Sequence, residues 1–286
     1  MPPETPEIPY ILKPNLHNAT APSNTKINTD EMGLRYQGAN TRYEAKSHNE
    51  YRIVFLGDSF TFGQGVDNDK VFSHIISEYL NKWQSDYKVK IFNFGVSGYN
   101  VKTMVDTFYY RALRVKPDLV IMCIIYDDFD INRTGVVDSY GYTVNKYGSE
   151  HSKFWSFTKR LLRNVHLVYI LRDIFRPSPG PESETVEGIP QTYQYLQQFK
   201  DIAEAQGISY LIVTLPSKHP RDAHILEIQE QLQKDNIRYY DLFSLADSIS
   251  LRDFSLNKRD AHPSSLVHKR IADLLGRYIL DNYLKN

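Results

Sequence analysis

A serine early in the chain and a histidine near its end have the residue types that nucleophilic catalysis requires. Ser59 closes the triplet Gly57-Asp58-Ser59, and His262 closes the triplet Asp260-Ala261-His262. A serine hydroxyl becomes an effective nucleophile when an imidazole accepts its proton, and a carboxylate fixes the tautomer of that imidazole. Ser59, His262 and Asp260 are therefore candidates for nucleophile, base and orienting carboxylate.

Glycines follow an apolar run further along the chain, in Asn93-Phe94-Gly95-Val96-Ser97-Gly98. Acyl transfer places negative charge on an oxygen in the transition state, and a glycine lets a backbone N–H approach that oxygen. Gly95 and Gly98 could also serve only to turn the chain into the next helix, and we keep this interpretation for Gly95.

The elements that must position these residues follow an alternating pattern. Short β-branched and apolar runs, typical of buried parallel strands, alternate with segments whose apolar residues have helical spacing. This alternation predicts an α/β fold of three layers, α/β/α, with a mostly parallel five-stranded sheet. The active site of such a sheet lies beyond the carboxyl ends of its strands. The strand-like runs are 53–56, 89–94, 119–125, 210–215 and 237–243, and the helical faces are 72–80, 104–113, 196–203, 225–232 and 271–279.

The order of these motifs resembles that of the SGNH (GDSL-type) hydrolases, bacterial type. The segment 57–63, Gly-Asp-Ser-Phe-Thr-Phe-Gly, is similar to the family's serine block, and Gly98 matches its second-block glycine. Residues 27–35 also resemble the stretch that precedes the serine block in many bacterial members. The resemblance implies the SGNH hydrolase fold, which is flavodoxin-like, and an oxyanion hole that includes the N–H groups of Ser59 and Gly98.

The last block, Asp260-Ala261-His262-Pro263, is similar to the family's but has a shorter spacing. The usual pattern is Asp-x-x-His, whereas here Arg259 lies three residues before His262 and Asp260 lies two before it. Some relatives with an Asp-x-His-Pro pattern look similar. We therefore expect Asp260 to be the carboxylate of the triad.

The third block departs from the family pattern. Where SGNH enzymes have Gly-x-Asn-Asp, this chain has Ile125-Tyr126-Asp127-Asp128, so Asp127 replaces an asparagine of the oxyanion hole. An ionised carboxylate has no proton to donate, and losing one such donor costs about 10²- to 10³-fold in rate. Burial beside Asp128 could keep Asp127 protonated. Three interpretations stay open: a slower hydrolase, an enzyme for another acyl acceptor or pH, and a protein that binds without catalysis.

We expect one catalytic domain over residues 51–286, preceded by an N-terminal extension, residues 1–50, that packs on it. The extension is rich in Pro, Asn, Thr and charge, with isolated apolar residues that cannot form a core of their own. An insertion at about 130–190 contains several aromatic residues and then a Pro-, Gly-, Ser- and Glu-rich stretch. Its aromatic part is either a lid that shapes the substrate site or a short helix packed on the domain.

Composition argues against several other classes of protein. Lys plus Arg and Asp plus Glu both number 34, so no net charge attracts nucleic acid or an anionic membrane.

The longest apolar run, 119–126, is much shorter than the about 20 residues of a membrane-spanning helix, and it contains the only cysteine, Cys123. No phosphate-binding glycine motif follows a strand, and His219 and His224 lack the spacing of a helical zinc pair. We expect neither a metal nor a cofactor.

The function expected from the resemblance is ester hydrolysis through a seryl acyl-enzyme, on small acyl esters, acylated carbohydrates or lipids. Two alternatives remain. One is an acyltransferase that passes the acyl group to a glycan hydroxyl, and the other is a binding protein with the same fold and weakened catalysis. The first residues lack the basic and apolar regions of a signal peptide, but relatives often follow an export signal or anchor, so an extracytoplasmic location stays open. The oligomeric state stays open too.

Overall fold

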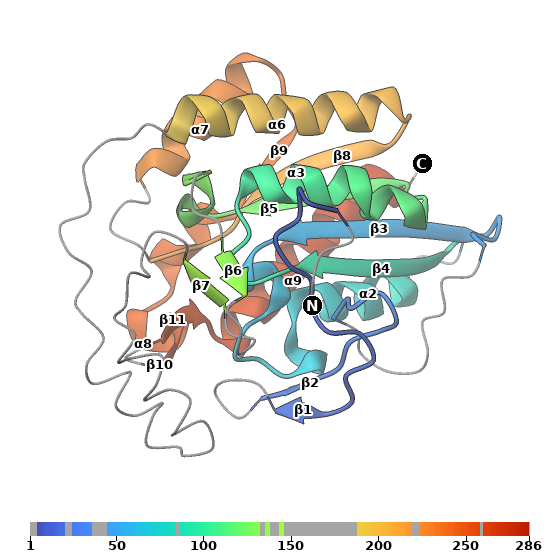
Figure 1. Ribbon diagram of the computed structural model, residues 1–286, viewed down its shortest axis with the longest axis horizontal. Coiled ribbons are helices and arrows are strands. Elements are labelled where there is room, and N and C mark those ends of the chain that lie inside the picture. Colours follow the sequence, from blue (N-terminus) through green and yellow to red (C-terminus); the bar gives the residue numbers. More distant parts are fainter. Residues whose placement is uncertain are drawn as a thin grey trace.

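The computed structural model of the protein describes residues 5–20, 25–35, 45–83, 86–131, 135–137, 143–145, 188–218, 223–257 and 260–285. Its central element is a parallel sheet of five strands in the order β4-β3-β5-β8-β9 (Figure 1). Each strand-like run of the sequence forms one of these strands, and their order is that of a flavodoxin-like sheet. The strands are β3 (Glu50–Gly57), β4 (Lys88–Gly95), β5 (Leu119–Ile124), β8 (Ser209–Thr214) and β9 (Tyr239–Asp241).

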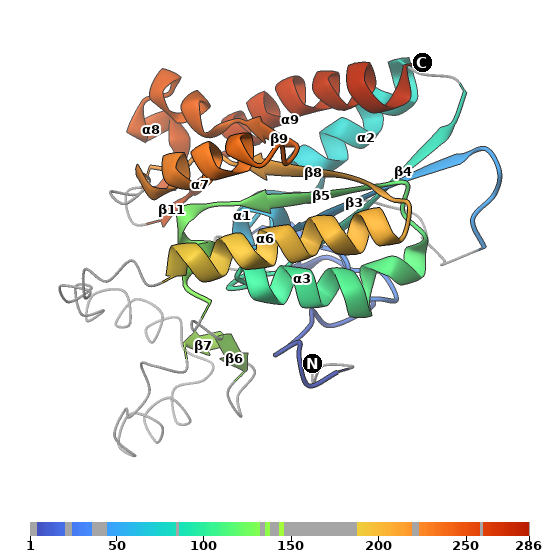
Figure 2. The same ribbon diagram turned by 90° about the horizontal axis from the view of Figure 1, so that it is seen from above.

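Helices cover both faces of the sheet, because each crossover between parallel strands carries a helix across one face. Helices α3 and α6 lie on one face, and α2 and α9 lie on the other (Figure 2). Consecutive residues of β3 point to opposite faces: Val54 is buried on the α3 side and Phe55 on the α2 side. The predicted three-layer α/β/α fold is confirmed. The main helices are α2 (Phe72–Trp83), α3 (Val101–Tyr110), α6 (Gly188–Ala205), α7 (Ala223–Lys234) and α9 (Ser265–Ile279).

The structure also contains short strands and helices that the sequence patterns did not predict. Among the described residues, three antiparallel pairs are formed by β1 with β2, β6 with β7, and β10 with β11. None of the helices in the described ranges is long and apolar enough to cross a bilayer. The short strands are β1 (Ala19–Thr20), β2 (Lys26–Ile27), β6 (Gly135–Val137), β7 (Thr143–Asn145), β10 (Ser255–Asn257) and β11 (Asp260–Pro263). The short helices are α1 (Ser59–Phe62), η2 (Asn68–Lys70), η3 (Ala112–Val115), η4 (Tyr126–Phe129), η6 (Phe243–Ser248), α8 (Leu251–Phe254) and the π-helical turn η7 (Leu280–Leu284).

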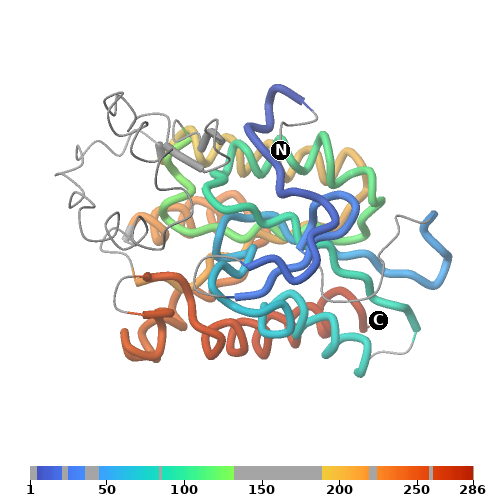
Figure 3. The backbone as a smooth tube through the Cα atoms, turned by 60° about the horizontal axis from the view of Figure 1, so that its bottom comes forward, coloured from blue at the N-terminus to red at the C-terminus, as the bar shows by residue number. Residues whose placement is uncertain are grey.

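The N-terminal segment, defined here as residues 5–20 and 25–35, lies along one edge of the sheet (Figure 3). Arg35 forms an isolated antiparallel bridge with Asn93 of the edge strand β4. Ile8, Tyr10 and Leu34 are buried in the same core cluster as the α3 side of the sheet. An uncovered edge strand would present unpaired N–H and C=O groups to solvent, so this segment also shields part of β4.

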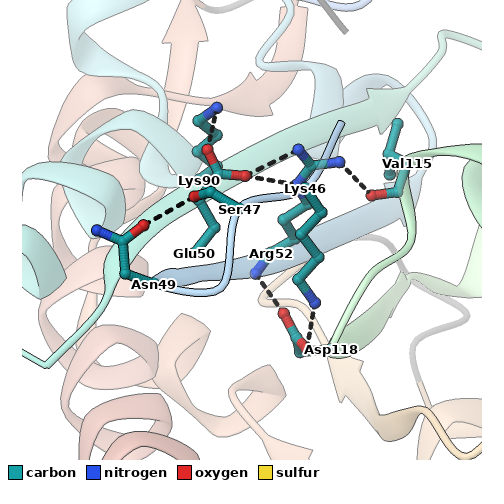
Figure 4. Close-up of polar contacts among 8 residues, drawn as sticks. All are labelled: Lys46, Ser47, Asn49, Glu50, Arg52, Lys90, Val115 and Asp118. Carbon is teal, nitrogen blue, oxygen red and sulfur yellow. Dashed lines mark hydrogen bonds and ion pairs between the residues drawn. The ribbon is translucent and has the colours of Figure 1, made fainter. Parts of the chain in front are cut away.

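A network of charged side chains holds the amino end of β3 (Figure 4). Arg52 donates to the carbonyl oxygen of Val115 at 2.8 Å and to Glu50 Oε2 at 2.8 and 3.0 Å, while its N–H donates to Asp118 at 2.7 Å. Burial raises the pKa of Glu50, but hydrogen bonds and charges from Lys90 and Arg52 outweigh it and lower the pKa to about 2. This network fixes the strand at the end opposite to the serine.

The insertion expected at about 130–190 lies largely outside the described residues. Within them, β6 and β7 form an antiparallel pair, and α6 begins at Gly188. A lid role for the aromatic residues of this segment therefore stays a prediction.

Candidate active site

The candidate nucleophile lies where β3, the strand between β4 and β5, ends and the one-turn helix α1 begins. Asp58 is the N-cap of this helix, and its Oδ1 accepts the N–H of Phe60 at 2.8 Å. A Cβ added at Gly57 would lie 2.0 Å from Thr61 Oγ1, so the glycine is needed for the close approach of the threonine. The motif therefore encodes a tight turn that places Ser59 at the carboxyl end of the sheet.

The candidate base and its carboxylate lie on the short strand β11, which pairs with β10. Residues two apart on a strand point to the same side, so Asp260 and His262 face the same way despite the shortened spacing. The Nδ1 of His262 lies 2.6 Å from Asp260 Oδ1, and this oxygen also accepts the backbone N–H of His262 at 3.1 Å. Arg259, the residue at the usual position of the carboxylate, lies outside the described residues.

The hairpin of β10 and β11 brings His262 to the serine, although 203 positions separate them in sequence. The Nε2 of His262 lies 2.9 Å from Ser59 Oγ, which is hydrogen-bonding distance. The ring of Phe60 packs beside the imidazole, with the ring centres 5.5 Å apart. The side chains of His262 and Asp260 are 23% and 24% exposed, so solvent reaches both.

Asp58 is a second hydrogen-bond partner for the serine that the sequence did not reveal. Its Oδ2 lies 3.1 Å from Ser59 Oγ, so Asp58 and His262 compete for the hydroxyl proton. Burial raises the pKa of Asp58, against the opposing effects of the Phe60 N–H, His262 and the Ser59 hydroxyl. The nearby charge of Asp127 raises the pKa further.

Two backbone N–H groups near the serine are available to an oxyanion. Gly57 and Gly95 are paired in register at the ends of β3 and β4, so Ser59 and Gly98 follow neighbouring strands at the same edge of the sheet. Within the described residues, neither the Ser59 N–H nor the Gly98 N–H has a hydrogen-bond partner. Free N–H donors at this edge are what a developing oxyanion requires.

The two acidic residues after β5 have different surroundings. Asp128 is buried, and its Oδ2 accepts the N–H of Ile125 at 2.9 Å, which closes the turn of η4. Asp127 is half-buried in the same turn, close enough to Asp58 for the charge of one carboxylate to affect the other. A role for Asp127 in the oxyanion hole stays a prediction.

Comparison with protein families gave one match that covers most of the chain. The model of the GDSL-like lipase/acylhydrolase family matches residues 55–270, a range that contains Ser59, Gly98, Asp260 and His262. The chain belongs to the GDSL-like lipase/acylhydrolase family. It is therefore a hydrolase that acts on ester bonds, and the sequence resemblance is confirmed at the level of the family. A comparison with curated proteins found no match.

Solved structures with a similar fold are also GDSL-type proteins or esterases. A putative lipolytic protein of the G-D-S-L family from Desulfitobacterium hafniense is 16% identical, with a TM-score of 0.50 over 80% of this chain and 99% of its own. The acetyl xylan esterase AlAXEase is 15% identical, with a TM-score of 0.51 over 80% and 99% of the two chains. A catalytic mutant of an acetylxylan esterase from Geobacillus stearothermophilus is 13% identical, with a TM-score of 0.50 over 82% and 96%. These similarities show the fold.

This GDSL-like acylhydrolase also positions its serine with residues that sequence reasoning did not assign. Asn93 Nδ2 donates to the carbonyl oxygen of Thr61 at 2.8 Å and so ties α1 to β4. Arg35 Nη1 donates to the carbonyl oxygen of Phe62 at 2.9 Å from the N-terminal segment. The only signal for Arg35 in the sequence was the resemblance of residues 27–35 to the stretch that precedes the serine block in relatives.

Proposed function

We propose that the protein is a serine esterase that removes small acyl groups, with acetylated carbohydrates as its substrate class. The observation that carries this proposal is the continuous series of hydrogen bonds from Ser59 Oγ through His262 to Asp260, at 2.9 and 2.6 Å. Such a series can activate a serine and stabilise the imidazolium that forms. The substrate class rests on the two acetylxylan esterases among the similar solved structures.

In the first half-reaction, Ser59 Oγ attacks the ester carbonyl carbon while its proton moves to Nε2 of His262. The electron pair of the carbonyl bond moves to the oxygen, which becomes the oxyanion. When the tetrahedral intermediate collapses, the bond to the leaving alkoxide breaks, and His262 gives its proton to that oxygen. In the second half-reaction, water attacks the acyl-enzyme with His262 as base, and the carboxylic acid leaves Ser59.

The remaining residues have supporting roles in this proposal. Asp260 accepts the proton-bearing Nδ1 of His262, which leaves the lone pair on Nε2, the nitrogen next to the serine. The N–H groups of Ser59 and Gly98 stabilise the oxyanion, and Asp127 replaces the asparagine that is a third donor in the family pattern. The hydrogen-bonding distances from Ser59 to His262 and from His262 to Asp260 favour an active enzyme over a binding protein that has lost its activity.

The proposal is tested with p-nitrophenyl acetate and acetylated xylooligosaccharides on wild type and on Ser59→Ala. We expect hydrolysis and labelling by a fluorophosphonate probe in wild type, and neither in Ser59→Ala. Ser248→Ala is a matched control, because Ser248 is exposed and its hydroxyl donates only to the carbonyl oxygen of Leu245. This control should keep wild-type activity.

Release of free acetate separates hydrolysis from transfer of the acetyl group. If added oligosaccharide acquires the acetyl group and little acetate is released, the protein is a transferase. If wild type shows neither turnover nor labelling of Ser59 between pH 5 and 9, the enzymatic proposal is wrong.

A further inference from the structure

The turn that carries Gly98 is one in which the peptide between Ser97 and Gly98 can take two orientations. Tyr99 N–H donates to the carbonyl oxygen of Val96 at 3.1 Å, which closes a β-turn with Ser97 and Gly98 at its centre. Gly98 has a φ of 81° and Ser97 is not among the residues with positive φ, so the turn is type II. A type I turn differs from it by a flip of the central peptide, and glycine at the third position is compatible with both.

The orientation of this peptide decides where the Gly98 N–H points. In a trans peptide the C=O and the N–H point in opposite directions, so a donor that holds the Ser97 oxygen also aims the Gly98 N–H. The Tyr10 hydroxyl of the N-terminal segment donates to the Ser97 carbonyl oxygen. The Gly98 N–H, on the other side of the same peptide, has no partner among the described residues.

We propose that Tyr10 is a positioning residue of the oxyanion hole, which keeps the Ser97–Gly98 peptide in the orientation that presents the Gly98 N–H to the substrate. This inference rests on the proposed function, because it gives the Gly98 N–H the role of an oxyanion donor. Tyr10 also polarises that peptide, since a hydrogen bond to its carbonyl oxygen strengthens the N–H as a donor.

The packing of Tyr10 suits this role. Tyr10 is buried and its ring meets that of Tyr99 edge to face, with the centres 5.6 Å apart. The Tyr99 hydroxyl donates back to the backbone oxygen of Tyr10, so each tyrosine holds the main chain of the other segment. Burial raises the pKa of Tyr99, which keeps this hydroxyl protonated.

The other contact of the turn does not restrict the flip. Ser97 Oγ donates to Gln64 Oε1 at 2.6 Å, and the Gln64 N–H donates to the carbonyl oxygen of Ser59 at 3.0 Å. This contact holds the side chain of Ser97, which keeps its place when the peptide that follows it rotates. Among the described contacts of the turn, the Tyr10 hydroxyl is therefore the one that selects the orientation of the peptide.

The experiment compares Tyr10→Phe with Tyr99→Phe, using hydrolysis of p-nitrophenyl acetate and inhibition by a trifluoromethyl ketone. Both variants loosen the contact between the N-terminal segment and the turn, but only Tyr10→Phe releases the Ser97 oxygen. We expect Tyr10→Phe to lower kcat by about 10- to 100-fold with KM within about 2-fold, and Tyr99→Phe to have a clearly smaller effect. The ketone forms a tetrahedral adduct with an oxyanion, so its affinity should fall in Tyr10→Phe by about the same factor as kcat.

Two further variants separate the proposal from a loss of structure. Tyr283→Phe removes a tyrosine hydroxyl that donates to the carbonyl oxygen of Tyr210 at 3.1 Å, away from the site, and should keep wild-type activity. Replacement of Tyr10 by 4-aminophenylalanine restores a donor at the same place and should recover most of the lost kcat. This rescue also shows the effect of the hydrogen bond if Tyr10→Phe itself folds poorly.

The outcomes distinguish the inference from the proposed function. Equal kcat values in Tyr10→Phe and Tyr283→Phe, equal losses in Tyr10→Phe and Tyr99→Phe, or a fall in kcat without weaker ketone binding each overturn the role of Tyr10. All three results leave the serine esterase intact, provided that Ser59→Ala remains inactive. Absence of hydrolysis by wild type overturns both.

Discussion

The guanidinium of Arg35 donates a hydrogen bond to the carbonyl oxygen of Gly63, the residue that ends the helix of the candidate nucleophile. The same guanidinium donates to the carbonyl oxygens of Phe62 and Val66, and its Nε donates to Asn68 Oδ1 at 3.0 Å. Burial lowers the pKa of Arg35 to about 10, so the side chain stays charged at neutral pH. A buried cation from the N-terminal segment thus holds the loop that follows Ser59.

Arg35→Lys should destabilise the protein although it keeps the charge. An ammonium group cannot reproduce the planar fork that reaches several acceptors at once, and buried carbonyl oxygens lose their donors. We expect the free energy of unfolding, measured in urea, to fall by about 2–4 kcal/mol. Arg114→Lys, at an exposed position, should change it by less than about 0.5 kcal/mol. Equal stability of the two variants would show that the Arg35 contacts contribute little.

Asp260→Asn should leave the fold intact and remove most of the activity. The amide can donate to Nδ1 of His262 and so favours the wrong tautomer, with no lone pair on Nε2 for the Ser59 proton. We expect kcat to fall by about 10³- to 10⁴-fold with a small change in KM. Asp273→Asn, which removes an exposed carboxylate near Lys269, is the control. A loss below about 10-fold would mean that another group orients His262.

Asp127→Asn should raise the activity. If Asp127 occupies the oxyanion hole, an amide there can donate a hydrogen bond to the oxyanion where an ionised carboxylate repels it, and one such donor is worth about 10²- to 10³-fold in rate. The change also removes a charge that raises the pKa of Asp58. The measurement is kcat with p-nitrophenyl acetate across pH 5 to 9. A lower kcat with unchanged unfolding would instead give the Asp127 carboxylate a role of its own.

Gly98→Ala should destabilise the protein more than an alanine substitution at a glycine where a positive φ is the only obstacle. Gly98 has a φ of 81°, and a Cβ there would lie 2.9 Å from the Tyr10 hydroxyl. Gly207 is the matched control, because it has a φ of 65° but no atom within 4 Å of an added Cβ. We expect Gly207→Ala to cost about 1–2 kcal/mol of unfolding free energy in urea and Gly98→Ala to cost more. Equal costs would show that the turn moves away from Tyr10 easily.

His268 should make the stability depend on pH. Burial lowers the pKa of His268 to about 3, with further lowering by the charges of Arg35 and His262. The unfolded chain, with an ordinary histidine pKa of about 6.5, binds more protons than the folded one between pH 6.5 and 3. The free energy of unfolding should therefore fall as the pH falls through this window, by up to about 5 kcal/mol.

His268→Gln, which cannot titrate, should flatten this part of the stability curve. His17→Gln, at an exposed position, should keep the wild-type slope. The measurement is urea unfolding at a series of pH values from 7 to 4. An unchanged slope in His268→Gln would assign the pH dependence to other groups, such as Glu50, whose stabilising effect is lost at lower pH, from about 4.5 down to about 2.

The sequence determined the parallel sheet and the positions of the serine and Gly98. The run 53–56 lies inside β3 (Glu50–Gly57), and the run 119–125 covers β5 (Leu119–Ile124), because burial on both faces of a sheet requires contiguous apolar residues. The serine and Gly98 follow the ends of two such strands, and a parallel sheet places those ends at one edge. These features depend on residues that are close in sequence.

Only the tertiary structure decided how Asp260 contacts His262 and which residues hold the turn of the serine. The shortened Asp-x-His spacing is compatible with the geometry because β11 pairs with β10, and an extended strand turns both side chains to one side. Arg35 and Tyr10 reach the site from the N-terminal segment, and the bond from Tyr10 spans 87 positions in sequence. Such contacts arise when distant segments pack together, and no pattern of neighbouring residues records them.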